Sequence, residues 1–145
     1  MVDLDENKRA VVRYFKALDD GDLAAVEQLF AHNCRIHRPG LHEPLIGHDG
    51  IKSVVSAAKE RYRVLKTEIG CILAEGDLVA CRLHHYAEFV RPWPTRLGAF
   101  DVTGKNVSWD PLVLFRFELG KIAEEWVCRD ELGMMIDLGV LTAPS

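Results

Sequence analysis

The sequence predicts an α+β protein in which helices come first, strands follow, and one short helix closes the chain. Three segments within the first 62 residues repeat apolar side chains at helical spacing. Four segments between residues 67 and 129 instead alternate apolar and polar side chains, which is typical of strands that bury one face. Helices followed by consecutive hairpins favour an α+β fold. Because the chain has 145 residues and is 48% hydrophobic, we expect residues 1–145 to form a single domain.

Capping residues indicate where the N-terminal helices begin. Asp3 and Glu6 match a capping box, so the first helix is expected to start there. Asp22 follows a stretch of aspartates and glycine that ends this helix, and it can cap a second one. We expect a second helix over residues 23–30 and a short strand over residues 34–38. A loop over residues 40–50 and a third helix over residues 51–62 are expected to follow.

Two hairpins are expected in the C-terminal half of the chain. Their strands cover residues 67–74 with 78–89, and residues 107–117 with 121–129. Between the hairpins, residues 90–100 contain two prolines, which cannot donate the backbone hydrogen bonds of a central strand. We therefore expect a loop there, and a long loop on a rigid sheet often serves as a binding lid.

Composition and charge exclude several classes of protein. The net charge of −4 and the pI near 5.8 indicate a soluble acidic protein and give no reason to expect nucleic acid as a partner. The N-terminus lacks the apolar core of a signal peptide, and no 18-residue apolar run occurs, so we expect no membrane insertion and a cytoplasmic location.

The cysteine spacing predicts neither a metal site nor a disulfide. None of the four cysteines forms a CxxC pair, so we expect no zinc knuckle and no bound metal. Cys71 and Cys81 flank a turn symmetrically, but in a cytosolic chain we interpret them as small buried hydrophobic residues.

Two stretches carry a family resemblance: VVRYFKALDDGDLAAVEQLF at residues 11–30 and FRFELGKIAEEWVCRDELGMMIDLG at residues 115–139. They resemble the SnoaL-like polyketide cyclases and their ester-cyclase relatives, which belong to the nuclear transport factor two-like superfamily. The resemblance extends over residues 7–140. It implies a cone-shaped fold, in which a strongly curved antiparallel sheet wraps round a hydrophobic pocket, N-terminal helices close the other side, and a short C-terminal helix follows.

The resemblance and the strand alternation together give four candidate catalytic residues: Tyr14, His37, His85 and Asp130. In the superfamily's steroid isomerases a tyrosine at the helix position of Tyr14 donates a hydrogen bond to the substrate oxygen; the alternative is a core tyrosine. His37 matches a histidine frequent in the ester cyclases. Since His37 and Arg38 are adjacent on a strand, only one of them is expected to enter the pocket.

His85 continues the apolar alternation of its strand, so it is expected to face inward and its neighbour His84 outward. A histidine can act as acid or base near neutral pH, although a hydrogen-bonded core histidine is the alternative. Asp130 is a good N-cap for a terminal helix that ends at Gly139. Its second expected role is to orient His37 or His85 from within the pocket.

The candidate substrate-binding residues are apolar or cationic: Arg38, Trp93, Trp109, Val113, Phe115 and Val127. By the resemblance, the steroid isomerases and cyclases carry an acidic residue or histidine where this chain has Val113, and the cyclase aspartate falls at Val127. Both valines depart from the family pattern. On the last strand, alternation places Glu124 and Trp126 on one face and Glu125 and Arg129 on the other. In a structural interpretation of this run, the carboxylates of Glu124 and Glu125 lie on the convex or dimer face.

We predict a small cofactor-independent enzyme that acts by acid-base chemistry on an apolar, oxygenated small molecule, as a cyclase, isomerase, dehydratase (a lyase) or hydrolase. The alternative is a non-catalytic ligand-binding or assembly module with the same fold. We also predict a homodimer. Leu112 and Leu114 are apolar at outward-facing strand positions that are otherwise polar, and relatives commonly dimerise through this face of the sheet.

Overall fold

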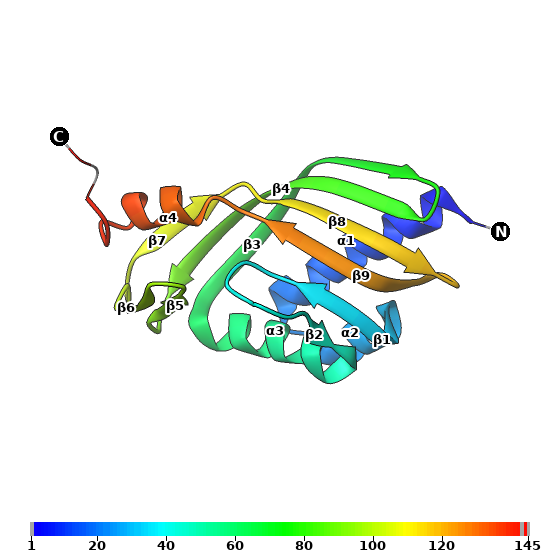
Figure 1. Ribbon diagram of the computed structural model, residues 1–145, viewed down its shortest axis with the longest axis horizontal. Helices are drawn as coiled ribbons and strands as arrows, with labels where there is room; N and C mark the ends of the chain where they lie inside the picture. The colour runs from blue at the N-terminus through cyan, green and yellow to red at the C-terminus, as the bar shows by residue number, and fades with distance from the viewer. Residues whose placement is uncertain (1, 143, 145) are drawn as a thin grey trace.

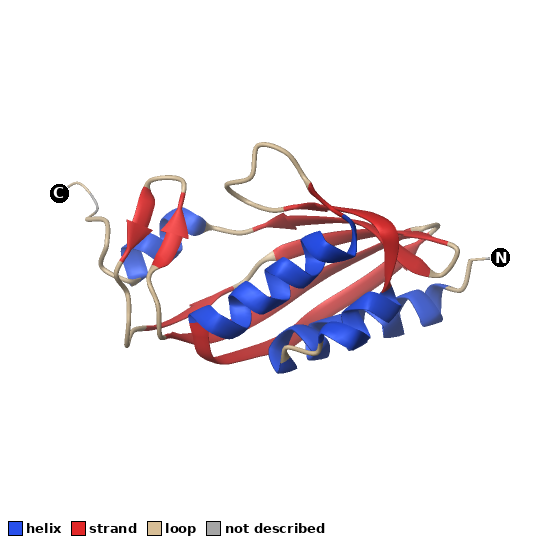
Figure 2. Ribbon diagram, turned by 90° about the horizontal axis from the view of Figure 1, so that it is seen from below, coloured by secondary structure: helices blue, strands red, loops and turns tan. Residues whose placement is uncertain are grey.

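The computed structural model describes residues 2–142 and 144 and confirms the α+β arrangement. Three helices at the N-terminus cross one face of a curved, unclosed sheet, and a short helix lies near the C-terminus (Figures 1 and 2). The helices are α1 (Leu4–Asp20), α2 (Leu23–Leu29), α3 (Gly47–Arg61) and α4 (Glu131–Asp137). The strands are β1 (Phe30–His37), β2 (Leu45–Ile46), β3 (Tyr62–Glu75), β4 (Leu78–Phe89), β5 (Trp93–Thr95), β6 (Gly98–Phe100), β7 (Asn106–Trp109), β8 (Leu112–Glu118) and β9 (Lys121–Cys128).

The predicted caps fix the helix starts. The Asp3 side chain accepts a hydrogen bond from the backbone N–H of Glu6 at 3.0 Å, and Asp22 does the same for Ala25 at 3.1 Å. α1 ends at Gly21, whose φ of +71° lies in the left-handed region that favours glycine. These contacts are local in sequence, which is why the capping residues could be recognised without the fold.

The main sheet has the strand order β2-β1-β9-β8-β4-β3, and β7 pairs with β4 beside β8. Its described pairs are antiparallel except β1 and β9, which run parallel. Parallel strands need a long connection, and here α3 and the two hairpins supply it. The parallel pair places Arg38, just after β1, beside the β9 residues that follow Glu124.

Three local breaks in the strands correct the predictions. The strand expected over residues 107–117 is divided at Asp110 and Pro111 into β7 and β8, and the Pro111 carbonyl accepts instead from Leu83 N–H at 3.1 Å. A register shift between Ile69 and Cys71 reverses the side-chain alternation, so Cys71 is exposed rather than buried. The expected loop over residues 90–100 contains the small β5–β6 hairpin.

Two apolar clusters form the interior. The larger lies between α1, α2, α3 and the concave face of the sheet, and the smaller joins α4 to Phe89, Trp93 and Val107. The cysteines at 34, 71, 81 and 128 are free thiols. No helix among residues 2–142 and 144 is long and apolar enough to cross a membrane.

A candidate active site between the helices and the sheet

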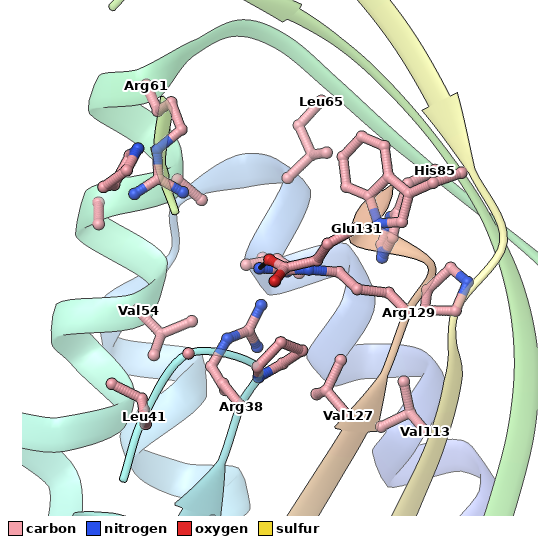
Figure 3. A pocket seen from close by; sticks show the side chains of 18 of the residues that line it. Arg38, Leu41, Val54, Arg61, Leu65, His85, Val113, Val127, Arg129 and Glu131 are labelled. Atoms are coloured by element: carbon pink, nitrogen blue, oxygen red, sulfur yellow. Dashed lines mark hydrogen bonds and ion pairs between the residues drawn. The ribbon is translucent and has the colours of Figure 1, made fainter. Parts of the chain in front are cut away.

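A cavity of about 410 Å³ lies between α1, α3 and the concave face of the sheet. Residues from β5 and from the start of α4 also contribute to its wall, so the segment expected to be a lid does border the cavity. A volume of this size is typical of small-molecule sites. Figure 3 shows its mixed lining, with aliphatic side chains at Leu65, Val113 and Val127 and several charged groups that point inward.

His85 lines this cavity from β4 and is 7% exposed. Its ring lies 5.0 Å from that of Trp109, centroid to centroid. Burial lowers the pKa of His85 to about 4, and the nearby positive charges of Arg38 and Arg129 act in the same direction. His85 is therefore a neutral imidazole at pH 7.

Thr67 and Asp19 hold the imidazole from behind. The Thr67 hydroxyl lies 2.6 Å from Asp19 Oδ1 and 2.9 Å from His85 Nδ1, and the Thr67 backbone N–H donates to Asp19 Oδ2 at 2.8 Å. A carboxylate can only accept, so the single hydroxyl proton goes to Asp19. The hydroxyl oxygen must then accept from Nδ1–H of His85, which leaves Nε2 unprotonated and free to act as a base.

A second polar group, Glu125, lies at the cavity wall beside Tyr14 and Arg38. Glu125 is 1% exposed, and its Oε1 lies 3.6 Å from Arg38 Nη1. Burial raises the pKa of Glu125, while the positive charge of Arg38 opposes that shift. The pKa of the buried Tyr14 hydroxyl is raised well above its ordinary value by burial and by Glu125. The Tyr14 hydroxyl therefore keeps its proton and can donate one hydrogen bond, either to Glu125 or to an oxygen in the cavity.

Arg129 and Glu131 form a third polar group where β9 leads into α4. Arg129 Nη2 lies 3.1 Å from Glu131 Oε2, and Arg96 Nη2 lies 3.0 Å from Glu131 Oε1. All three residues line the cavity. In Figure 3 the side chains of Arg38, Arg129 and Glu131 converge on its centre.

Seven of the ten residues predicted from the sequence line the cavity, and they come from both halves of the chain: Tyr14, Arg38, His85, Trp93, Trp109, Val113 and Val127. Phe115 does not reach it. Its side chain is fully buried behind the wall, where its ring centroid lies 5.9 Å from that of Tyr14 and 5.8 Å from that of Phe15.

His37 and Asp130 also lie outside the cavity. His37 is directed to the outer face of the sheet, where its Nε2 lies 2.5 Å from Glu124 Oε2 and its ring stacks on Trp126. Its neighbour on the strand, Arg38, is the one that faces inward, as strand alternation requires. Asp130 caps α4 by accepting from the Gly133 N–H at 2.8 Å, and its side chain is exposed. The structure therefore shows the capping role and no contact with either histidine.

Sequence reasoning missed several polar residues of the site, among them Glu125, Arg129 and the Thr67–Asp19 pair behind His85. Glu125 was expected on the outer face with Glu124, but it lies directly opposite Phe115 on β8, and paired residues of two strands point the same way. The alternation of β9 relative to β8 could therefore have indicated that Glu125 faces inward. Arg129 shares the strand phase of Glu125 and Val127, so the same signal was available for it. The Thr67–Asp19 pair gave no comparable signal, because its position depends on long-range packing.

Within residues 2–142 and 144, no three histidine, cysteine or acidic side chains converge as ligands of a metal ion would. The polar groups that converge on the cavity are an imidazole, a phenol, guanidinium groups and two carboxylates.

Comparisons with known proteins agree with this architecture. A family model described as SnoaL-like polyketide cyclase matches residues 8–138. The fold is similar to that of TsrD from Streptomyces laurentii, with a TM-score of 0.82 and 20% identity over 97% of this chain and 100% of that one. It is also similar to AclR from Streptomyces galilaeus, a suggested hydroxylase (TM-score 0.78, 21% identity, 99% and 87% coverage).

A third similar structure is IdmH from Streptomyces antibioticus, a suggested polyketide cyclase, with a TM-score of 0.76 and 23% identity over 92% of this chain and 98% of that one. No curated protein matches the sequence. At these identities the structural likeness concerns the fold alone.

Proposed function

Because this chain belongs to the SnoaL-like polyketide cyclase family, we propose that it is a cofactor-independent enzyme whose cavity binds an apolar, oxygenated small molecule. In this proposal His85 moves a proton on that molecule. The family assignment agrees with the resemblance seen at residues 11–30 and 115–139. Neither the family nor the fold specifies the reaction, so the proposal depends on the site.

The observation that carries the proposal is the hydrogen-bonded chain from Asp19 through Thr67 to His85. It supports a neutral imidazole whose unprotonated Nε2 is the available base. A base that must accept a proton at neutral pH has to be unprotonated beforehand, and the low pKa of His85 ensures this. A low pKa also makes the resulting imidazolium a strong acid, so the proton is readily returned to the substrate.

The reaction that this geometry supports best is proton abstraction from a carbon next to a carbonyl group. His85 Nε2 takes the proton, the C–H electron pair forms a carbon–carbon double bond, and the carbonyl oxygen takes up the negative charge. The Tyr14 hydroxyl and the guanidinium of Arg38 are the cavity groups suited to stabilise that oxygen. Return of the proton at another carbon would be an isomerisation, and attack of the carbanion on a second carbonyl would be a cyclisation.

The experiment is hydrogen–deuterium exchange into activated C–H bonds of β-tetralone, a bicyclic ketone, followed by NMR in deuterated buffer. We expect exchange above the buffer rate in the wild type and a loss of ~10²-fold or more in His85→Gln, as is usual when a general base is removed. His37→Gln is the matched control, since His37 faces away from the cavity, and it should exchange at the wild-type rate. Equal rates in the wild type and His85→Gln would refute the role of His85.

A second candidate function is ligand binding without turnover. It is favoured by one observation, the presence of Val113 and Val127 on the cavity wall, where the family resemblance leads one to expect acidic groups or histidine. In that case β-tetralone would raise the melting temperature of the protein, but its exchange would proceed at the buffer rate.

A further inference from the structure

We propose that the cavity binds a ligand that carries a carboxylate, and that Arg38, Arg61 and Arg129 receive this group. The inference rests on the proposed function in taking this cavity as the substrate site. It adds the chemical class of the substrate: an apolar body with one anionic group.

The charge of the cavity differs in sign from the charge of the whole chain. The protein has a formal net charge of −4. The charged side chains that line the cavity are four arginines, at 38, 61, 96 and 129, and two glutamates, at 125 and 131, which leave a local charge of +2. Such a concentration of positive charge in a partly enclosed cavity attracts anions.

Arg129 is more enclosed than Arg38 and Arg96, whose side chains are 22% and 64% exposed. Its side chain is 15% exposed, and its Nε is buried without a hydrogen-bond partner among the described residues. Its counterion is shared, because one oxygen of Glu131 faces Arg129 and the other faces Arg96. One carboxylate cannot neutralise two guanidinium groups, so part of the charge of Arg129 is left for a ligand.

Arg38 faces Arg129 from the other side of the cavity. Its own contact with Glu125, at 3.6 Å, is longer than a charge-assisted hydrogen bond, which is about 2.7–2.9 Å. Burial lowers the pKa of Arg129, and the nearby positive charge of Arg38 acts in the same direction. Two like charges held in an enclosed site are unfavourable unless an anion lies between them.

Arg61, near the end of α3, completes the cationic wall. It has no carboxylate partner within residues 2–142 and 144, and its guanidinium carbon lies 5.8 Å from the centre of the Tyr62 ring. Figure 3 shows its side chain directed toward the cavity from the helix side, opposite Arg129. The three arginines therefore approach one region from three different elements or connections: the end of β1, α3, and the β9–α4 junction.

The geometry suits a carboxylate because guanidinium groups bind its two oxygens with paired N–H donors. The remainder of the ligand would lie against Trp109, Val113 and Val127, which line the same cavity without charge. A bound anion would also place its apolar body near His85. The expected substrate is therefore an aromatic or polycyclic carbonyl compound that also carries a carboxylate.

The experiment compares two probes of the same shape, β-naphthoate and β-naphthamide, by isothermal titration calorimetry. In the wild type we expect the carboxylate to bind at least about tenfold more tightly than the amide, the effect of one charged hydrogen bond. Arg129→Gln and Arg61→Gln should each weaken binding of the carboxylate by about tenfold and leave that of the amide unchanged. Arg82→Gln, at an exposed position outside the cavity, should bind both probes as the wild type does.

Equal affinities of the two probes for the wild-type protein would overturn the inference, and this comparison needs no variant to fold. A preference for the carboxylate that survives in both arginine variants would overturn it as well. The proposed function fails separately: if β-tetralone exchange is absent while the carboxylate preference remains, His85 is not the base but the anion site stands. If exchange occurs and the carboxylate preference is absent, the role of His85 as the base stands and the anion site is refuted.

Discussion

The Thr67 hydroxyl lies 2.9 Å from Nδ1 of His85, and this contact determines which nitrogen of the imidazole carries the proton. The Thr67 hydroxyl donates its single proton to Asp19, so the hydroxyl oxygen can only accept a hydrogen bond from the histidine. The relationship joins the end of α1 to the β3–β4 edge of the main sheet. It makes the protonation state of the proposed base a consequence of the fold.

We predict that His85 exists as the Nδ1–H tautomer at pH 7, which nitrogen-15 NMR of the imidazole ring can show directly. In Thr67→Val the acceptor is lost, and the proton should distribute between the two nitrogens. Thr67→Ser keeps the hydroxyl and is the matched control, so it should restore the wild-type spectrum. An Nε2–H tautomer in the wild type would contradict the role assigned to Thr67.

The stability of the protein should depend on pH through His85. The pKa of this residue is about 4 in the folded state, against 6.5 for an ordinary imidazole, so between these values the unfolded chain binds a proton that the folded chain does not. The contribution is fully present above pH 6.5 and is lost as the pH falls toward 4, by up to about 3 kcal/mol. Urea unfolding at several pH values measures this change.

The variant His85→Gln isolates that contribution from those of other titrating groups. Its free energy of unfolding should fall less steeply than that of the wild type between pH 6.5 and 4. His42→Gln, in an exposed loop, is the control. Parallel curves for the wild type and His85→Gln would mean that the imidazole is accessible to protons in the folded state.

Asp130 should matter for stability through its cap and not for turnover through the cavity. Asp130→Ala is expected to lower the free energy of unfolding by ~1 kcal/mol, whereas Asp130→Asn should leave it nearly unchanged, because asparagine is an equally good cap. Exchange of β-tetralone should be the same in Asp130→Asn and in the wild type. A large loss of exchange in Asp130→Asn, at an unchanged melting temperature, would contradict this prediction and show that Asp130 takes part in the active site.

Gly133 offers an independent check of the same cap. A Cβ added at Gly133 would lie 2.3 Å from Asp130 Oδ2, so Gly133→Ala must displace the capping carboxylate. Despite the higher helix propensity of alanine, we expect this variant to be less stable than the wild type in thermal unfolding.

We predict that two copies of the chain associate through the outer face of the sheet. Leu112 is 58% exposed there, and Leu114 lies directly opposite Trp126 on the neighbouring strand. Light scattering at micromolar concentration should give the mass of a dimer for the wild type and of a monomer for Leu112→Glu. Leu97→Glu, at an exposed leucine in the β5–β6 turn, should remain dimeric. A monomeric wild type would contradict the prediction.

The sequence by itself determined the features that depend on local chemistry and on the periodicity of apolar residues. The caps Asp3, Asp22 and Asp130 act on backbone groups a few residues away, so they marked the helix starts correctly. Alternation also placed His85 inward and His84 outward, where His84 pairs with Asp110 on the exposed side. The fold class followed because alternation of this kind leaves few ways to bury the apolar faces.

Only the tertiary structure decided which polar groups meet. The turn places Glu75 opposite Leu78, and without a bulge that register would place Glu68 opposite His85. The shift between Ile69 and Cys71 brings Thr67 there instead, and the packing of α1 against β3 adds Asp19. Similarly, the parallel β1–β9 pair brings Arg38 to Glu125. Such contacts join residues far apart in the chain, and their register depends on packing that no local pattern records.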